Sequence, residues 1–357
     1  MKKLINQIKL LNRARNNRLK ELKRKVKLIV LSWTMAKKSE SDKIVPAMIK
    51  KITFPFVDLG LGDAVCHTAI WQRLKNAGYI VQVITDERNR DFLQHLDCID
   101  EIIVIDLRNV KSVSSVQTDL VINLYSWLKR KELFNTQLLA KIKHKYAISV
   151  GGLLSRPYNI VIAAPENTHI TRPQQSILKL LNVDADNLRY SLPCLPHHDE
   201  FIHKYLSRYN GKKIIVVNPF ASVDERSFSP VQLENLLHRL DQIDHHIFII
   251  GEKKKLKNID IKSESITICE FSSLWDAISL IIKADLVISV DTSIVHIACA
   301  FDKNLVSVFY SIFLDNDENL QGNIIFAPIG DKAKVVIFED DNTMADIYLE
   351  AQRIIGD

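Results

Sequence analysis

Short apolar runs alternate with helical segments along this chain, and the whole alternation occurs twice. In the first half, strands are predicted at residues 51–57, 79–85, 101–106, 120–124 and 146–150, with helices within 59–78, 88–95 and 131–143. In the second half, strands are predicted at 213–218, 246–250, 266–269, 286–289 and 305–309, with helices beginning near Ser229, Leu274 and Ser293. Strands joined through helices form parallel sheets. The pattern therefore predicts two α/β domains of the Rossmann type, facing each other across a central cleft.

The chain divides into four predicted segments. A basic N-terminal arm covers residues 1–46, two Rossmann-like domains cover 47–190 and 197–340, and a C-terminal helix covers 341–357. The N-terminal domain is one candidate surface for the packing of this last helix. Two prolines in residues 191–196 and the absence of periodicity there indicate a linker. A length of 357 residues suits two such domains.

Composition predicts a cytoplasmic protein without a transmembrane span. The apolar stretches 26–33 and 243–250 are far shorter than the roughly 20 residues that cross a bilayer. The first residues lack the apolar run and cleavage site of a secretory signal. Five cysteines are scattered without a CxxC pair, so we expect reduced thiols rather than a disulfide framework or a zinc site.

Positive charge is concentrated at the N-terminus. Residues 1–38 carry 13 Lys and Arg against one acidic residue, Glu21. Apolar residues recur there mostly at three- and four-residue steps, at Leu4, Ile8, Leu11, Leu19, Leu22, Val26, Ile29 and Trp33. This spacing predicts a basic amphipathic helix suited to an anionic membrane surface. A helix packed on the body and a solvated charged helix are the alternatives; a nucleic-acid partner is not expected, because no aromatic platform accompanies the charge.

The first polar cluster follows the strand at 51–57. Gly60, Gly62 and Asp63 stand at the start of a helix, with His67 and Arg73 further along it. Glycines allow close backbone approach, and a helix N-terminus offers free N–H groups to an anion. The cluster predicts a turn that faces an anion; a simple strand-to-helix turn capped by Asp63 is the alternative.

Two further clusters follow strands of the second half. After the strand at 213–218, a loop of small residues contains Ser222 and Arg226, and Arg226 is suited to a departing diphosphate. Glu252, after the strand at 246–250, stands where a carboxylate would hold a ribose. The strand at 286–289 leads into the third cluster, a turn and an apolar helix containing Asp291, Thr292, Ser293 and His296. Backbone N–H groups at this helix start predict a diphosphate seat.

Together these motifs resemble the family 9 glycosyltransferases, the lipopolysaccharide core heptosyltransferases, over roughly residues 50–357. Asp291-Thr292-Ser293-Ile294-Val295-His296 is similar to the family's aspartate-threonine-glycine-x-x-histidine stretch, with serine in place of glycine. Gly62-Asp63 resembles its N-terminal glycine-aspartate motif, although Ala69 stands at a usual proline. Arg226-Ser227-Phe228-Ser229 replaces lysine-x-tryptophan-proline. These departures indicate a divergent member.

The resemblance implies an inverting enzyme of the GT-B fold, with residues 47–190 as the acceptor-binding domain and 197–340 as the nucleotide-sugar-binding domain. His67 and Arg73, on the helix after Asp63, are candidates to face an anionic acceptor. The resemblance also implies heptose transfer from ADP-L-glycero-D-manno-heptose to a Kdo or heptose of the lipid A-linked inner core, at the inner face of the cytoplasmic membrane. Asp63 would be the general base and Arg226 would stabilise the leaving diphosphate. The donor would be held by Gly62, Ser222, Glu252, Asp291, Thr292, Ser293 and His296.

No metal or other cofactor is expected. Asp184-Ala185-Asp186 and Asp315-Asn316-Asp317 have the spacing of a metal-binding pair, but neither follows a convincing buried strand. A different donor, a protein acceptor as in autotransporter heptosyltransferases, and a silent sugar-nucleotide-binding protein remain alternatives. An NAD-dependent oxidoreductase is disfavoured because Val65 occupies the third glycine position of GxGxxG.

Overall fold

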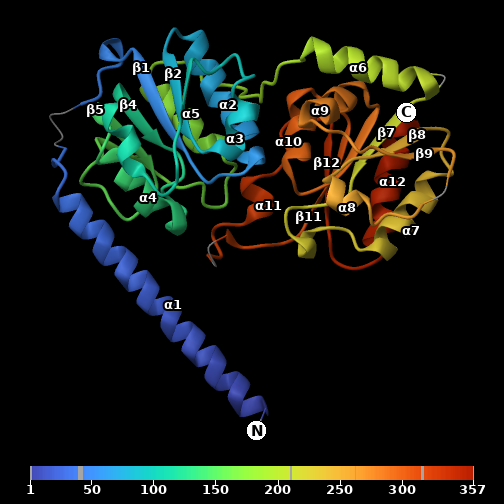
Figure 1. Ribbon diagram of the computed structural model, residues 1–357, viewed down its shortest axis with the longest axis horizontal. Coiled ribbons are helices and arrows are strands. Elements are labelled where there is room, and N and C mark those ends of the chain that lie inside the picture. Colours follow the sequence, from blue (N-terminus) through green and yellow to red (C-terminus); the bar gives the residue numbers. More distant parts are fainter. Residues whose placement is uncertain (1, 39–42, 210, 262, 315–316, 357) are drawn as a thin grey trace.

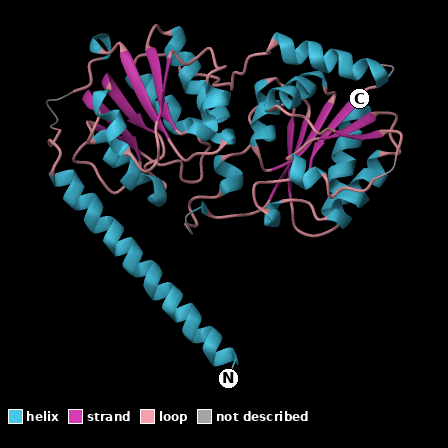
Figure 2. Cartoon of the chain, viewed as in Figure 1, coloured by secondary structure: helices cyan, strands magenta, loops and turns pink. Residues whose placement is uncertain are grey.

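A computed structural model describes residues 2–38, 43–209, 211–261, 263–314 and 317–356. It contains two parallel sheets of six strands, each covered by helices on both faces (Figures 1 and 2). This arrangement is the predicted GT-B architecture. The two sheets lie within the ranges 47–190 and 197–340 expected for the domains.

The N-terminal sheet has the strand order β3-β2-β1-β4-β5-β6. Its strands are β1 (Lys51–Phe56), β2 (Ile80–Thr85), β3 (Glu101–Val104), β4 (Gln117–Asn123), β5 (Lys143–Val150) and β6 (Ile160–Ile162). Its helices are α2 (Leu61–Asn76), α3 (Glu87–Leu93), α4 (Lys129–Leu139) and α5 (Thr171–Leu180).

The C-terminal sheet has the order β12-β11-β10-β7-β8-β9. Its strands are β7 (Ile214–Asn218), β8 (His246–Ile249), β9 (Ile266–Ile268), β10 (Leu286–Val290), β11 (Leu305–Phe309) and β12 (Ala333–Ile337). The helices of this half are α6 (Pro196–Leu206), α7 (Pro230–Leu240), α8 (Lys253–Leu256), α9 (Leu274–Lys283), α10 (Ser293–Ala300), α11 (Gly322–Ile325) and α12 (Thr343–Gly356).

Both sheets reverse their strand order between the two central strands. In the N-terminal sheet the chain winds outward from β1 through β2 and β3, then returns to the other side of β1 through β4; β7 and β10 are the corresponding pair in the second sheet. Crevices open at such reversals, beyond the carboxyl ends of the strands, and ligands bind there. The topology therefore predicts two facing crevices, beyond β1/β4 and beyond β7/β10.

The two domains share apolar packing. One buried cluster continues from α2 and α5 of the N-terminal domain to α9 and α10 of the C-terminal domain. Phe92 of α3 stacks on Trp275 of α9, with ring centroids 5.3 Å apart and ring planes 15° apart. Tyr190, between the domains, meets the His296 ring edge-on at 5.6 Å. These contacts set the position of one crevice relative to the other.

Helix α1 (Lys2–Trp33) is the predicted basic helix, and it extends well away from the body (Figure 1). Leu28 is fully buried and joins the apolar cluster around α4. Arg24 forms an ion pair of 3.0 Å with the buried Glu132 of α4. None of the described helices is long and apolar enough to cross a membrane.

The C-terminal helix does not pack on the N-terminal domain. Helix α12 packs instead on α7 and on strands β10, β11 and β12 of the second sheet. Met344, Ile347 and Ala351 lie on its buried face, within the cluster that fills one side of this sheet. Because these three residues already bury the apolar face of α12 locally, the helix completes its own domain.

Candidate active site

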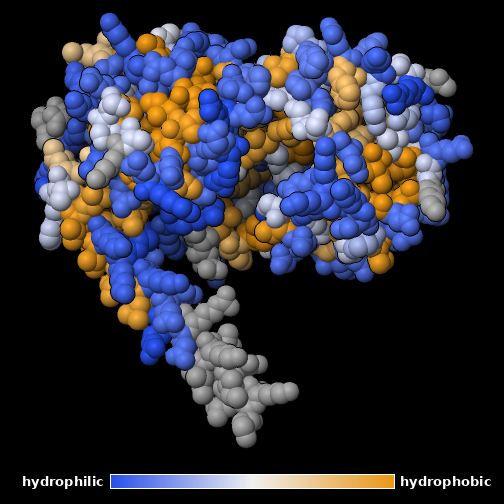
Figure 3. Space-filling view, in the orientation of Figure 1, coloured by the Kyte–Doolittle hydropathy of each residue, from blue (hydrophilic) through white to orange (hydrophobic). Residues whose placement is uncertain are grey.

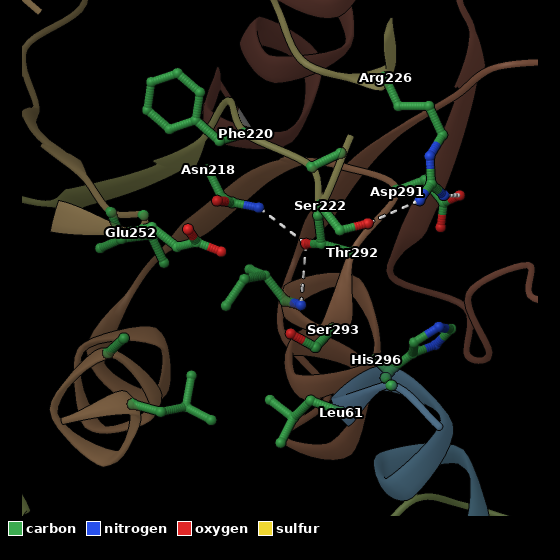
Figure 4. A pocket seen from close by; sticks show the side chains of 18 of the residues that line it. Leu61, Asn218, Phe220, Ser222, Arg226, Glu252, Asp291, Thr292, Ser293 and His296 are labelled. Carbon is green, nitrogen blue, oxygen red and sulfur yellow. Dashed lines mark hydrogen bonds and ion pairs between the residues drawn. The ribbon is translucent and has the colours of Figure 1, made fainter. Parts of the chain in front are cut away.

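A cavity of about 810 Å³ lies between the domains, at the carboxyl ends of the central strands. Nine of the eleven site residues predicted from the sequence line it: Gly62, Asp63, Ser222, Arg226, Glu252, Asp291, Thr292, Ser293 and His296. Figure 4 shows how those from the C-terminal domain converge. Asp63 is the carboxylate that the N-terminal domain contributes to the cavity lining.

Asp63 occupies the third position of α2, just beyond the end of β1. Its Oδ2 accepts a hydrogen bond of 2.8 Å from the Gly60 backbone N–H, which satisfies one free donor at the helix start. Its Oδ1 accepts a hydrogen bond of 2.7 Å from the hydroxyl of Tyr125, which follows β4. The carboxylate is therefore held from both of the central strands of its sheet.

The surroundings of Asp63 act on its pKa in opposite directions. Burial raises the pKa of Asp63, whereas the hydrogen bonds from Tyr125 and Gly60 and the nearby charges of Arg130 and Lys131 pull it back down. The net pKa shift is upward. A carboxylate with a raised pKa is a stronger base than an ordinary aspartate, which suits proton removal from a hydroxyl.

The start of α10 forms the opposite wall. Thr292 caps this helix, and its Oγ1 accepts a hydrogen bond of 3.2 Å from the Ile294 backbone N–H. The Asn218 side chain, at the end of β7, donates to the same Thr292 oxygen at 2.9 Å and to Ser289 at 3.0 Å. This network joins the ends of the two central strands and fixes a helix N-terminus toward the cavity, where backbone N–H groups favour an anion.

Arg226 lies beside that helix start. It donates a hydrogen bond of 2.7 Å to Asp291 Oδ2 and one of 3.1 Å to the Ser222 hydroxyl (Figure 4). Burial raises the pKa of Asp291, while the guanidinium of Arg226 opposes the shift. Lys255 supports the same loop by donating to the Ala221 carbonyl at 2.7 Å and pairing with Asp224 at 3.1 Å. The Arg226 guanidinium is thus oriented before any phosphate reaches it.

Gly62 and His296 lie where the two domains touch. A methyl group in place of the Gly62 hydrogen would lie 3.3 Å from His296 Cδ2 and 3.4 Å from Ser293 Cα. The absence of a side chain at Gly62 therefore lets α2 approach α10 closely. Burial lowers the pKa of His296 to about 3, so its ring is neutral near pH 7. Its Nδ1 has no hydrogen-bond partner among the described residues.

Two predicted acceptor residues are not in the cavity. His67 is 1% exposed, and its ring is stacked against Tyr125 with its Nδ1 2.6 Å from the Asp63 carbonyl. Arg73 pairs with Asp184 at 2.5 Å on the exterior. Arg73 is ten residues beyond Asp63, about 15 Å along the helix. The structure does not bring these two residues into the cavity, because α2 buries the side that carries His67 and places Arg73 away from the cleft.

The cavity also contains residues that the sequence motifs missed. Arg130, at the start of α4, lines it and makes no hydrogen bond or ion pair with any described residue. Lys131 is buried and donates to the Asp58 carbonyl and side chain, holding the turn after β1. The sequence signal was the run of three basic residues, 129–131, a few residues beyond β4, a central strand of the sheet. Glu252 lines the far side of the cavity and is exposed to it.

Of the two aspartate-x-aspartate spacings, Asp184-Ala185-Asp186 is not among the residues that line this cavity. Asp184 is paired with Arg73 on the exterior, whereas Asp315 and Asn316 lie outside the described residues. Within the described ranges, no group of three or more His, Cys, Asp or Glu side chains is placed to hold a metal ion. Metal independence stays a prediction.

Two Rossmann-type sheets facing one cavity, with a carboxylate on one wall and an anion-binding helix start on the other, define the GT-B class of fold. The model of "Glycosyltransferase family 9 (heptosyltransferase)" matches residues 107–343, about two thirds of the sequence. The chain belongs to this family.

Individual relatives agree with this assignment. The chain is 21% identical over 297 residues to an Escherichia coli K12 protein described as "Putative lipopolysaccharide heptosyltransferase 4", covering 80% of this chain and 81% of that one. A family 9 glycosyltransferase from Veillonella parvula superposes with a TM-score of 0.69 at 15% identity, covering 86% of this chain and 97% of that chain. The E. coli ADP-heptose lipopolysaccharide heptosyltransferase II gives 0.64 at 14% identity, with 86% and 98% covered. At such identities the structural likeness concerns the fold.

Proposed function

We propose that this protein is an inverting, metal-independent heptosyltransferase. It transfers heptose from ADP-L-glycero-D-manno-heptose to a Kdo or heptose of the lipid A-linked inner core. The observation that carries the proposal is the position of Asp63, which lines the same cavity as Arg226 and the Thr292–Ser293 helix start. A base on one wall and cationic and N–H groups on the other are the two parts that displacement of a diphosphate requires.

The chemistry of the site and of its relatives supports the proposed donor. Glu252 would hold the ribose, and the α10 N-terminus with Arg226 would hold the diphosphate; Gly62, Ser222, Asp291 and His296 complete the proposed donor site. E. coli WaaC, which shares the fold with a TM-score of 0.61 at 14% identity, has been solved with ADP-2-deoxy-2-fluoro heptose. We therefore propose an ADP-activated heptose, with no metal required.

In the proposed reaction, the acceptor hydroxyl attacks the anomeric carbon as the bond from that carbon to the diphosphate oxygen breaks. Asp63 takes the hydroxyl proton, and the electron pair of the broken bond leaves with ADP. Arg226 and the α10 backbone N–H groups stabilise the developing negative charge. Arg130, exposed on the acceptor side, supplies a positive charge for the anionic core sugar.

Transfer from ADP-heptose to Kdo- and heptose-terminated lipid A, measured with EDTA, tests the proposal. Asp63→Asn keeps the size of the side chain and one of its two acceptor oxygens but removes its basicity, so we expect a fall in kcat of about 10²-fold or more. Asp97→Asn, at an exposed position away from the cavity, is the matched control. If Asp63→Asn retains turnover, Asp63 is not the base. If the natural protein binds ADP-heptose but transfers heptose to neither acceptor, the result points to a protein acceptor or a silent binding protein.

The acceptor is lipid-linked, so we also propose that the enzyme works at the inner face of the cytoplasmic membrane and that residues 1–38 contact the anionic surface. Transfer to the same acceptor in detergent micelles and in vesicles tests this location. Transfer that is faster in anionic vesicles than in detergent micelles supports the membrane location.

A further inference from the structure

Helix α1 has one face that packs on the body and, roughly opposite, an apolar face that does not. The face on the body contains the buried Leu28 and Ser32, and Arg24 pairs there with Glu132. The apolar face stays exposed: its side chains are each between 40% and 69% exposed, and they are Leu19, Leu22, Val26, Ile29, Val30 and Trp33. We call these six residues the apolar stripe.

The stripe faces away from the protein. At about 100° per residue, its six side chains fall within an arc of about 100°, centred roughly opposite Leu28. Figure 3 shows hydrophobic side chains along one edge of this helix and hydrophilic ones along the other. The opposite face of α1, which contains Leu28, is therefore the one that packs on the body. No described residue covers the stripe.

Basic residues flank the stripe on both sides. The same helical geometry places Lys23 and Lys27 along one edge and Arg18 and Lys25 along the other, and all four are exposed. The one acidic residue of the helix, Glu21, lies toward the body and is paired with Arg24 at 2.8 Å. The exposed surface of this part of α1 is thus apolar at its centre and exclusively positive at its margins.

This charge pattern decides between possible occupants. A second copy of the helix would bring the positive margins of both stripes together, and like charges at such spacing repel. An anionic bilayer neutralises the margins with its headgroups and takes the apolar centre into the boundary of its acyl chains. The 69% exposed Trp33, at the end nearest the body, is of the residue type enriched at that boundary.

Resting on the membrane location proposed above, we infer that the apolar stripe of α1 is the surface that inserts into an anionic lipid bilayer. The helix lies in the plane of the interface, with Leu28 and Arg24 fixing the catalytic body to its opposite side. The body therefore faces the membrane in one orientation set by α1, and the cleft is held near lipid-linked acceptors. Lipid is the partner, and the recognised chemistry is a negative headgroup layer over an apolar interior.

The test is sedimentation of the full-length protein with phosphatidylcholine vesicles, with and without phosphatidylglycerol. In the stripe variant, Leu22→Gln, Val26→Gln and Ile29→Gln are combined, because glutamine preserves the helix while removing apolar area. We expect its partition coefficient on anionic vesicles to fall at least about 100-fold. The matched control combines Val231→Gln and Leu349→Gln, which are exposed apolar positions of α7 and α12, and should bind like the natural protein.

A second variant separates charge from apolar insertion. The double variant Lys23→Gln/Lys27→Gln should bind anionic vesicles about 10- to 30-fold more weakly than the natural protein. High salt should reduce this difference in binding between the two proteins. Unchanged vesicle binding by the stripe variant overturns the inference. So does light scattering that finds a dimer of the natural protein dissociated by the stripe substitutions, because the stripe would then bind a second copy.

Vesicle binding needs neither donor nor acceptor, so its outcome is independent of the transfer reaction. If the natural protein does not bind anionic vesicles but still transfers sugar to a water-soluble acceptor fragment, this inference alone is overturned. If the protein binds vesicles but does not transfer sugar to a water-soluble acceptor fragment, the proposed reaction alone is overturned.

Discussion

The hydroxyl of Tyr125 donates a hydrogen bond of 2.7 Å to Oδ1 of Asp63. The Tyr125 ring is stacked on His67, with centroids 5.0 Å apart, and is 1% exposed. A buried neutral phenol that donates to a carboxylate stabilises the ionised form of that carboxylate. Tyr125 therefore positions Asp63 and also opposes the rise of pKa that burial causes.

Removal of this hydroxyl should move the pH dependence of transfer. In Tyr125→Phe the pKa of Asp63 rises further, because the ionised form loses a donor. The loss is worth about 1.5–3 kcal/mol, or roughly one to two pH units. Since transfer requires ionised Asp63, the acid limb of kcat/KM should shift upward in pH. Tyr79→Phe, which removes a hydroxyl bonded to the Leu181 carbonyl outside the cavity, is the control; an unshifted limb in Tyr125→Phe contradicts the assignment.

The guanidinium of Arg226 should contribute to transfer through its two hydrogen-bond donors as well as through its positive charge. Arg226→Gln is expected to lower kcat/KM by about 10²–10³-fold, because the departing diphosphate loses a charged donor. Arg226→Lys should recover part of the rate, since a single ammonium cannot contact both Asp291 and Ser222 in the same geometry. Steady-state kinetics measures both, with the exposed Arg90→Gln of α3 as control. Equal activity of the Gln and Lys variants would argue that the positive charge has no role.

The close contact at Gly62 should couple the domains. Gly62→Ala places a methyl group against Ser293 and His296, so α2 and α10 must separate by a few tenths of an ångström. This moves Asp63 relative to the donor wall, and we expect kcat to fall about 10-fold or more. Calorimetric titration with ADP should detect a smaller loss of affinity. A loss confined to ADP affinity, with kcat unchanged, would show that Gly62 contacts the nucleotide rather than setting the domain spacing.

Buried neutral histidines should make the fold sensitive to acid. Burial lowers the pKa of His67 to about 4 and that of His296 to about 3. The unfolded chain, with an ordinary histidine pKa near 6.5, then binds more protons than the folded chain as the pH falls below about 6.5. Each histidine should therefore lower the free energy of unfolding by about 2 kcal/mol between pH 7 and pH 5.

Urea denaturation at both pH values measures this effect. His67→Asn removes one of the titrating groups, so its stability should depend less on pH over the same interval, whatever its stability at pH 7. An equally steep dependence in the variant would mean that His67 does not titrate as its burial implies.

Much of the fold was predictable because the central strands are buried on both faces. Such strands form continuous apolar runs, as in β7 and β10, whose residues are all buried. The edge strands β6 and β12, which are not buried on both faces, were not predicted, whereas the edge strands β3 and β9 were. Helix α6 was missed because Pro196 suggested a linker, although proline is well tolerated in the first turn of a helix.

By itself, the sequence determined the alternation of strands and helices, the family motifs and the three clusters at the ends of strands that line the cavity, because each depends on neighbouring residues in the chain. Only the tertiary structure decided which sides of α1 and α2 face the body. Residues 64–71 of α2 are all buried, so no periodicity marks a cleft side, and His67 became a support for Tyr125. In α1 the burial of Leu28, rather than the longer apolar stripe, attaches the helix to the body. Contacts between residues far apart in sequence choose the buried face, and local spacing carries no information about them.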